Sequence, residues 1–259
     1  MQTRTIVPDE AVQLFVKNIL VLTEEDPLKE TTLPFYADGY PGLMYHNGLH
    51  GLLVNPHNKI MPKLFLYGQT IHPIELVIKG AYRLLVFQLY PFVLKSFFNV
   101  QPETLNDTCY DIAQLPHNAG NQCIQQLEAT DDLNRQLNTM QNFLLSLFQQ
   151  QQESLDIVIA GAVQKIIAYR GQVAIKDLCA ELYLNERTLQ RRFFNVVGVT
   201  PKQFASIIQF QQSFEELTDK KFNKLTDIVY NNGFTDQSHF IKVFRAFTGK
   251  TPLAFKPQP

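Results

Sequence analysis

The first half of the chain alternates short apolar runs with turn-forming residues. The runs include GLMYHN, GLLVNP, KLFLYG, IELVIKG and YRLLVFQLYP, and Gly, Pro, Asn and His separate them. This punctuation is typical of short strands joined by tight turns. We therefore expect residues 1–120 to form a β-rich regulatory domain, a small barrel or jelly roll of the cupin-like kind.

A helical pattern follows in residues 121–152. The segment TDDLNRQLNTMQNFLLSLFQQ suits either a partner helix of a second copy or a helix that packs on its own β-rich domain. The polar run FQQQQES, residues 148–154, then predicts a linker or a helix end. The helical segment carries an apolar stripe formed by Leu133, Leu137, Met140, Leu144 and Leu147.

The stretch NNGFTDQSHFIKVFRAFTGKTP, near the C-terminus, predicts a helix with two unlike faces. Asp236 can cap its start, and Gly249 followed by Pro252 supplies its stop. A shorter helix in KLTDIVYNNGF precedes it, so the two form a helix-turn-helix. One face is apolar, formed by Phe240, Val243, Phe244 and Phe247. The other is poor in acids and suits phosphates and base edges, and it carries Gln237, Ser238, Ile241, Lys242 and Arg245.

The same pattern occurs twice. NERTLQRRFFNVVGVTPKQF (residues 185–204) aligns with DQSHFIKVFRAFTGKTPLAF (residues 236–255) at a constant offset of 255 − 204 = 51. Before the turn, Asp177 matches Asp227 at an offset of 227 − 177 = 50, so the second copy has one extra turn residue, which we expect to be its glycine. Packing alone does not explain a duplicated two-helix unit, so the repeat favours a binding function.

Both copies resemble the tandem helix-turn-helix domain of the AraC/XylS transcriptional regulators. The segments that carry the resemblance are DLCAELYLNERTLQRRFFNVVGVTPKQF and DIVYNNGFTDQSHFIKVFRAFTGKTPLAF. Gln209, Ser213 and Phe194 depart from the family pattern. The N-terminal spacing of DGYPGLMYHN, LYGQT and YRLLVFQLYPF is similar to the sensor-like domain of one subgroup of this family.

The resemblance implies an all-α DNA-binding domain at residues 153–259, with two recognition helices. These would enter successive major-groove segments about 34 Å apart. The expected base contacts of the first helix are Arg187, Gln190 and Arg191. The expected contacts of the second are Gln237, Ser238, His239, Lys242 and Arg245.

We expect the two recognition helices to divide their work. The second has Lys242 where the first has Arg191, and Ile241 where the first has Gln190. A lysine cannot make the planar two-pronged contact of an arginine. The first helix should therefore specify sequence, and the second should mainly anchor the protein.

Charge is distributed unevenly along the chain. The formal net charge is −1, yet the residues from 153 onward carry 14 Lys and Arg against 10 Asp and Glu. The basic half is the half with the repeat, which suits a nucleic-acid partner.

No segment is long and apolar enough to cross a membrane, and the N-terminal sequence lacks a signal-peptide pattern. The cysteines Cys109, Cys123 and Cys179 match neither a zinc pattern nor a disulfide framework. We therefore expect a cytoplasmic protein.

The alternative from another class is a metal-dependent cupin-like enzyme fused to a helical domain. Its ligands would be His46, His50, His57, His72 and Glu75. The spacing of these residues is not a compact ligand motif, and no nucleophile elbow or phosphate-binding glycine loop is present. We therefore expect no catalysis and no cofactor.

We thus expect an α+β chain of two domains, a sequence-specific transcription regulator controlled through its N-terminal domain. The partners are double-stranded DNA and, as the resemblance implies, a second copy, a small-molecule effector and RNA polymerase. The sequence identifies neither the effector nor the target genes. It does not distinguish an activator, which the resemblance favours, from a repressor.

Overall fold

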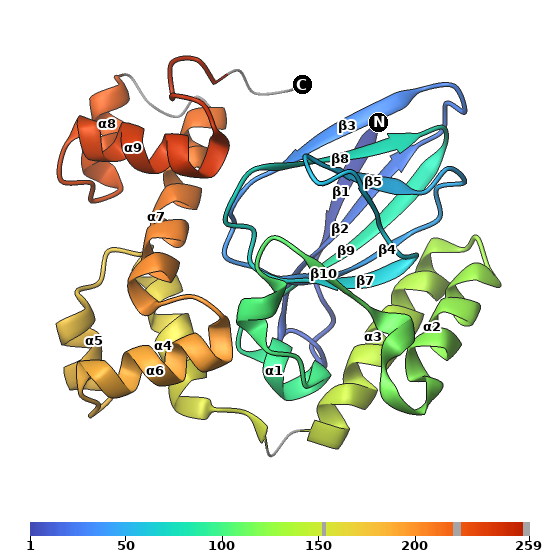
Figure 1. Cartoon of the computed structure of the whole chain (residues 1–259), viewed down its shortest axis with the longest axis horizontal. Coiled ribbons are helices and arrows are strands. Elements are labelled where there is room, and N and C mark those ends of the chain that lie inside the picture. The colour runs from blue at the N-terminus through green and yellow to red at the C-terminus, as the bar shows by residue number, and fades with distance from the viewer. Residues whose placement is uncertain (152–153, 220–223, 256–259) are drawn as a thin grey trace.

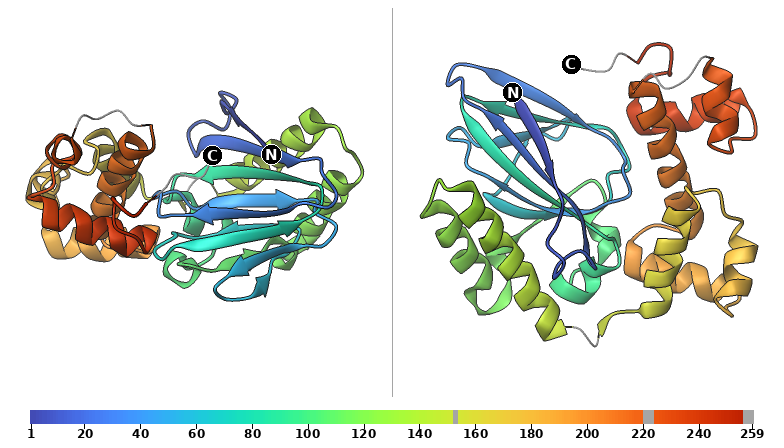
Figure 2. Two further views of the ribbon diagram at one scale, coloured as in Figure 1. Left: turned by 90° about the horizontal axis from the view of Figure 1, so that it is seen from above. Right: turned by 180° about the vertical axis from the view of Figure 1, so that it is seen from behind.

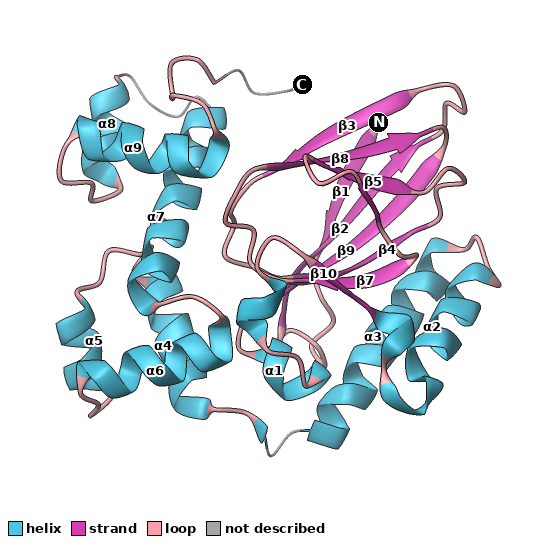
Figure 3. Cartoon of the chain, in the orientation of Figure 1, coloured by secondary structure: helices cyan, strands magenta, loops and turns pink. Residues whose placement is uncertain are grey.

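The computed structural model describes residues 1–259 except 152–153, 220–223 and 256–259. A part built on β-strands lies beside a part built only of helices (Figure 1), and the strands all precede the helical part along the chain (Figure 3). The expected α+β class is therefore confirmed.

The strands of the described chain form two antiparallel sheets. They are β1 (Gln2–Ile6), β2 (Val16–Glu24), β3 (Glu30–Phe35), β4 (Gly42–His46), β5 (Leu52–Asn55), β6 (Lys59–Ile60), β7 (Leu64–Tyr67), β8 (Ile74–Lys79), β9 (Tyr82–Leu89) and β10 (Cys109–Asp111). The first sheet has the order β1-β2-β9-β4-β7-β10, and the second has the order β3-β8-β5-β6.

The two sheets form an open sandwich. Of the expected barrel or jelly roll, the closed barrel is therefore wrong. In the described chain no strand ladder joins one sheet to the other. β1 ends the first sheet and β6 ends the second, and the side chains of both strands are almost all exposed. The sheets are instead held by apolar side chains between them.

The first sheet is buried on both faces because its side chains alternate. In the pairing of β4 with β9, Leu43 lies opposite Phe87 and Met44 lies opposite Val86. Met44 and Val86 face the second sheet, whereas Leu43 and Phe87 belong to the core that continues under the helices.

Helices cover the outer face of the first sheet. They are α1 (Val93–Phe98), the short 3-10 turns η1 (Pro102–Leu105), η2 (Ile112–Gln114) and η3 (Pro116–Asn118), α2 (Ala119–Glu128) and α3 (Leu133–Gln151). The stripe of α3 is buried in the core under this sheet from Leu137 to Leu147. Packing on the chain's own strands is therefore what this stripe does. Of the predicted linker, residues 148–151 end α3, and residues 152–153 lie outside the described residues.

The helical part is a column with one helix pair at each end of a central helix (Figure 1). Figure 2, from above and from behind, shows that this column stands along one side of the sandwich. Its elements are α4 (Ile157–Ala168), α5 (Ile175–Glu181), α6 (Glu186–Val197), α7 (Pro201–Thr218), α8 (Leu225–Asn231) and α9 (Gln237–Thr248). No helix of the described residues is both long and apolar enough to span a bilayer.

Candidate nucleic-acid interface

The two helix pairs, α5–α6 and α8–α9, have the same caps at the ends of their second helices. The side chain of Asn185 accepts a hydrogen bond from the Thr188 amide (2.8 Å) at the start of α6. Asp236 accepts one from the His239 amide (2.8 Å) at the start of α9. Glycines with positive φ end both helices, Gly198 at φ 85° and Gly249 at φ 73°. These equivalent caps confirm that the repeat is structural.

The extra residue of the second copy is not the glycine expected from the sequence, as the turn between the paired helices shows. Tyr183 and Gly233 both adopt positive φ, at 54° and 69°. The next residues match as well, because the Leu184 amide donates to the Cys179 carbonyl and the Phe234 amide to the Val229 carbonyl, both at 3.0 Å. The glycine is therefore matched by a tyrosine. The extra residue is Thr235, between Phe234 and the capping Asp236.

Each recognition helix buries one face and exposes the other. In α6, Leu189, Phe193 and Val197 are buried, and in α9 Phe240 and Phe244 are buried. The exposed side chains include every residue expected to contact DNA, namely Arg187, Gln190, Arg191, Gln237, Ser238, His239, Lys242 and Arg245.

Two of these side chains already have neighbours within the chain. The Gln190 amide donates to Glu186 (3.1 Å) on the preceding turn of α6. The His239 ring lies edge-on to Phe234, with ring centroids 5.6 Å apart. His239 therefore packs against the turn while remaining exposed.

The central helix α7 fixes the two pairs relative to each other. At 1.5 Å per residue its 18 residues span about 27 Å. Gln209 on α7 donates to the Asn232 carbonyl (2.7 Å), and Gln172, just after α4, donates to the Asn231 carbonyl (3.0 Å). These amides tie the turn of the second pair to the central helix α7 and to the segment between α4 and α5. Sequence reasoning noted Gln209 only as a departure from the family and missed Gln172.

The N-terminal part contacts the end of the first recognition helix. Lys95 on α1 donates to the Asn195 side chain (2.6 Å), and Asn106 donates to the Gly198 carbonyl (2.9 Å). A Cβ on Gly198 would lie 2.7 Å from the carbonyl carbon of Pro102 in η1. The backbones of the two parts therefore approach closely at this point, while the exposed face of α6 stays open.

A second contact joins the sandwich to α7 through residues 36–40. Ala37 is fully buried among residues of the second helix pair. The Tyr36 ring packs on Phe214 of α7, with centroids 5.3 Å apart. Gly39 has φ 82°, and a Cβ there would lie 2.8 Å from the side chain of Ile208. The sandwich thus touches both helix pairs, one through η1 and one through residues 36–40.

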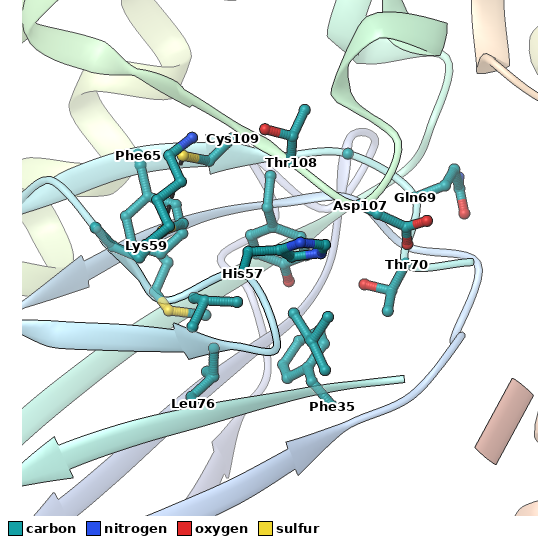
Figure 4. A pocket seen from close by; sticks show the side chains of 16 residues that line it. Phe35, His57, Lys59, Phe65, Gln69, Thr70, Leu76, Asp107, Thr108 and Cys109 are labelled. Atoms are coloured by element: carbon teal, nitrogen blue, oxygen red, sulfur yellow. Dashed lines mark hydrogen bonds between the residues drawn. The ribbon is translucent and has the colours of Figure 1, made fainter. Parts of the chain in front are cut away.

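A cavity of about 370 Å³ opens between the two sheets (Figure 4). Phe35, Phe65 and Leu76 supply apolar walls, and Gln69, Thr70 and Asp107 lie together on one side. A mainly apolar cavity with a few polar groups is the usual form of a small-molecule site.

Two residues that line this cavity each carry a polar atom without a hydrogen-bond partner among the described residues. These atoms are the Tyr67 hydroxyl and Oε1 of Gln69, both buried. The other end of the Gln69 amide donates to the Gly39 carbonyl (3.2 Å), in the segment that packs on α7. Gln69 therefore connects the cavity directly to the contact with the helical part.

A second cavity, of about 380 Å³, lies between the sandwich and the helical part. Asp38 lines it, accepting hydrogen bonds from the Tyr40 amide (2.9 Å) and the Gln88 side chain (2.7 Å). Burial raises the pKa of Asp38 to about 7, although these two hydrogen bonds oppose the shift. Lys17 and Glu215 line the same cavity.

We expect Asp38→Asn to become more stable than the wild type as pH rises. The raised pKa means that the native chain holds a proton that the unfolded chain releases between about pH 4 and pH 7. Wild-type stability should therefore fall through that range, by at most about 1.4 kcal/mol per pH unit, and then level off. Urea unfolding at about pH 4.5, 6 and 8 measures the difference in free energy of unfolding between the two proteins. A difference in stability that stays constant over these pH values would contradict the assignment.

The histidines that the metalloenzyme alternative requires as ligands do not come together in the described chain. Among the residues described, no group of three or more His, Cys, Asp or Glu side chains could hold a metal ion. His46 is buried in β4, where burial lowers its pKa, and His72 bonds Asp107 (2.6 Å). His57 lines the cavity between the sheets, and His50 is exposed.

Comparison with known proteins matches both parts of the chain. Residues 178–258 match a family described as a helix-turn-helix domain, and residues 4–111 match a domain of unknown function (DUF6597). The HTH-type transcriptional activator RhaS of Yersinia pestis (strain Pestoides F) is 30% identical over 90 residues, which are 35% of this chain and 33% of that protein. The match thus spans about one third of the length of this curated relative.

The solved structures that match this chain include ToxT and CuxR. Unsaturated fatty acid-bound wild-type ToxT from Vibrio cholerae strain SCE256 is 17% identical, with a TM-score of 0.45 over 90% of this chain and 93% of that chain. The AraC-like transcriptional activator CuxR is 12% identical, with a TM-score of 0.33 over 78% of this chain and 83% of that chain.

Proposed function

We propose that this chain, whose residues 178–258 match a helix-turn-helix domain family, is a sequence-specific DNA-binding transcription regulator of the AraC type. One observation carries the proposal. Two recognition helices, equivalent in their caps and in their buried faces, present polar and cationic side chains to solvent from the two ends of one rigid helix. Helices of this kind lie in the major groove, and two of them on one column suit successive groove segments on one face of DNA.

The exposed side chains divide into two chemical kinds. Arg191 can make a two-pronged contact with guanine, and Gln190 can do the same with adenine. Lys242 and Arg245 on α9 would act mainly on phosphates, which add affinity without sequence information. The first helix then selects the site and the second anchors the protein on it.

The N-terminal sandwich would control this binding through a small molecule in the cavity between its sheets. The unpaired Gln69 oxygen suits a mainly apolar ligand that carries a hydrogen-bond donor. Because the same Gln69 amide holds Gly39, a ligand that moves Gln69 would shift the segment packed on α7. The ligand would thereby bias the position of the helix pairs.

Thermal-shift screening of a metabolite collection tests this control. A compound that stabilises the wild type but not Gln69→Leu supports it. A compound that stabilises both proteins equally would place the ligand elsewhere.

Selection of bound fragments from genomic DNA tests the proposed function. The purified full chain should enrich fragments that share one sequence motif with two parts about one helical turn apart. The double variant Arg191→Ala, Lys242→Ala is the control, because both side chains are exposed and their loss should leave the fold intact. Enrichment no greater than that of this variant would refute the proposal.

A further inference from the structure

Phe194 is an exposed aromatic residue on the outer face of the first recognition helix. It lies on the same side of α6 as Arg187, Gln190 and Arg191, because it follows them by seven, four and three residues. Its side chain keeps 42% of its surface exposed, whereas the adjacent Phe193 is fully buried. Within the described chain Phe193 packs on the Phe204 ring (centroids 5.7 Å apart), and Phe194 has no ring contact.

The second copy shows that the helical repeat does not require an aromatic residue here. The equivalent position, 51 residues later, is Arg245, which is also exposed. Gly198, four residues after Phe194, contacts the N-terminal part through its backbone, and 42% of Phe194 stays exposed beside that contact. Its position on the helix face with two arginines favours a polyanion over an apolar protein surface.

We propose that Phe194 contacts the 5-methyl group of a thymine in the major groove and so makes the first helix select that base. This inference rests on the proposed DNA-binding function and extends it to one further base. An apolar side chain can distinguish thymine by its methyl group, which no other base of unmodified DNA carries.

Helix geometry gives the position of this thymine. Phe194 follows Arg191 by three residues, a rise of about 4.5 Å along the helix. Successive bases on one strand are about 3.4 Å apart. The thymine therefore lies within one or two base pairs of the guanine that Arg191 contacts.

Replacing each thymine of the selected site with deoxyuracil, one at a time, tests the proposal because only the methyl group is removed. When one particular thymine is replaced, the affinity of the wild type for the site should fall about fourfold. This is the effect expected from losing the burial of one methyl-sized group. Phe194→Ala should bind the thymine and uracil sites equally, and Phe194→Leu should retain part of the discrimination. Melting temperatures of the three proteins check that each is folded.

The outcomes separate this inference from the function on which it rests. If selection enriches no sequence at all, the proposed function and the thymine contact both fail. If a site is enriched but every uracil substitution affects wild type and Phe194→Ala alike, only the thymine contact is wrong. A Phe194→Ala variant that loses self-association instead, measured by sedimentation, would assign the side chain to a contact between copies and overturn the proposal.

Discussion

The Gly198→Ala variant is expected to unfold at a clearly lower temperature than the wild type. Gly198 has φ 85°, and a Cβ there would lie 2.7 Å from the Pro102 carbonyl carbon and 2.8 Å from the Glu103 amide nitrogen. Both are backbone atoms of η1, so no side chain can rotate away. A residue with a Cβ in this conformation costs about 1 kcal/mol, and overpacking adds about 1 to 3 kcal/mol.

Gly249→Ala is the matched control, because Gly249 ends the second recognition helix in the same way. Its φ is 73°, but a Cβ there would meet only the Pro73 ring, at 3.7 Å, an ordinary contact. This variant has the backbone cost without the clash. The difference in free energy of unfolding between the two variants therefore measures the close approach of α6 to η1. Equal losses in urea denaturation would contradict a role for that approach.

The same pair of variants shows whether the close approach keeps the sandwich on the first helix pair. Gly198→Ala should also lose the Asn106 hydrogen bond to the Gly198 carbonyl, which helps to hold the two parts together. Its radius of gyration in X-ray scattering should increase, and that of Gly249→Ala should not. A folded Gly198→Ala protein with an unchanged radius would mean that residues 36–40 hold the parts together without this contact.

The individual strands could be predicted from the sequence. Whether they form a closed barrel or an open sandwich could not. The runs around Leu43, Leu66 and Val86 gave β4, β7 and β9, because apolar runs bounded by turn residues reflect local burial. Whether a sheet closes depends on hydrogen bonding between edge strands that are far apart in the chain. The exposed edge strands β1 and β6 carry no sequence pattern that decides this.

The duplicated helix pairs were predictable because the caps repeat in the sequence. Asn185 and Asp236 mark the starts of α6 and α9, and both were found from spacing alone. The extra residue of the second turn was predicted wrongly as Gly233, because glycine is the usual residue at positive φ and the first copy has no glycine there. Tyr183 adopts that conformation at φ 54° and is 95% exposed, so the backbone geometry is shared although the residue types differ.

Contacts between distant segments lay beyond sequence reasoning. The stripe on α3 suited a second copy or the chain's own sheet equally well, because a periodic pattern defines a buried face without its partner. The Gln69 bond to Gly39 and the Gln172 bond to Asn231 join residues that are 30 and 59 positions apart. Single polar side chains of this kind have no periodicity, so only the folded chain reveals them.

Arg191→Ala and Lys242→Ala are expected to weaken DNA binding in different ways. Both side chains are exposed at equivalent positions of α6 and α9, so their loss should leave the melting temperature nearly unchanged. Arg191→Ala should cost about 1 to 3 kcal/mol on the selected site and little on scrambled DNA, because a two-pronged guanine contact is lost. Lys242→Ala should weaken binding to both DNAs alike. It should also reduce the slope of log affinity against log salt by about one unit.

Binding of each variant to both DNAs at several salt concentrations separates these two roles. Arg4→Ala is the control for charge alone, because Arg4 is exposed on β1, in the sandwich rather than on the helical column. It should reproduce neither effect. A Lys242→Ala loss confined to one base position of the selected site would show that α9 also selects sequence. If Arg191→Ala weakened binding to both DNAs equally, Arg191 would be an anchor, and the proposed division of work between the two helices would be wrong.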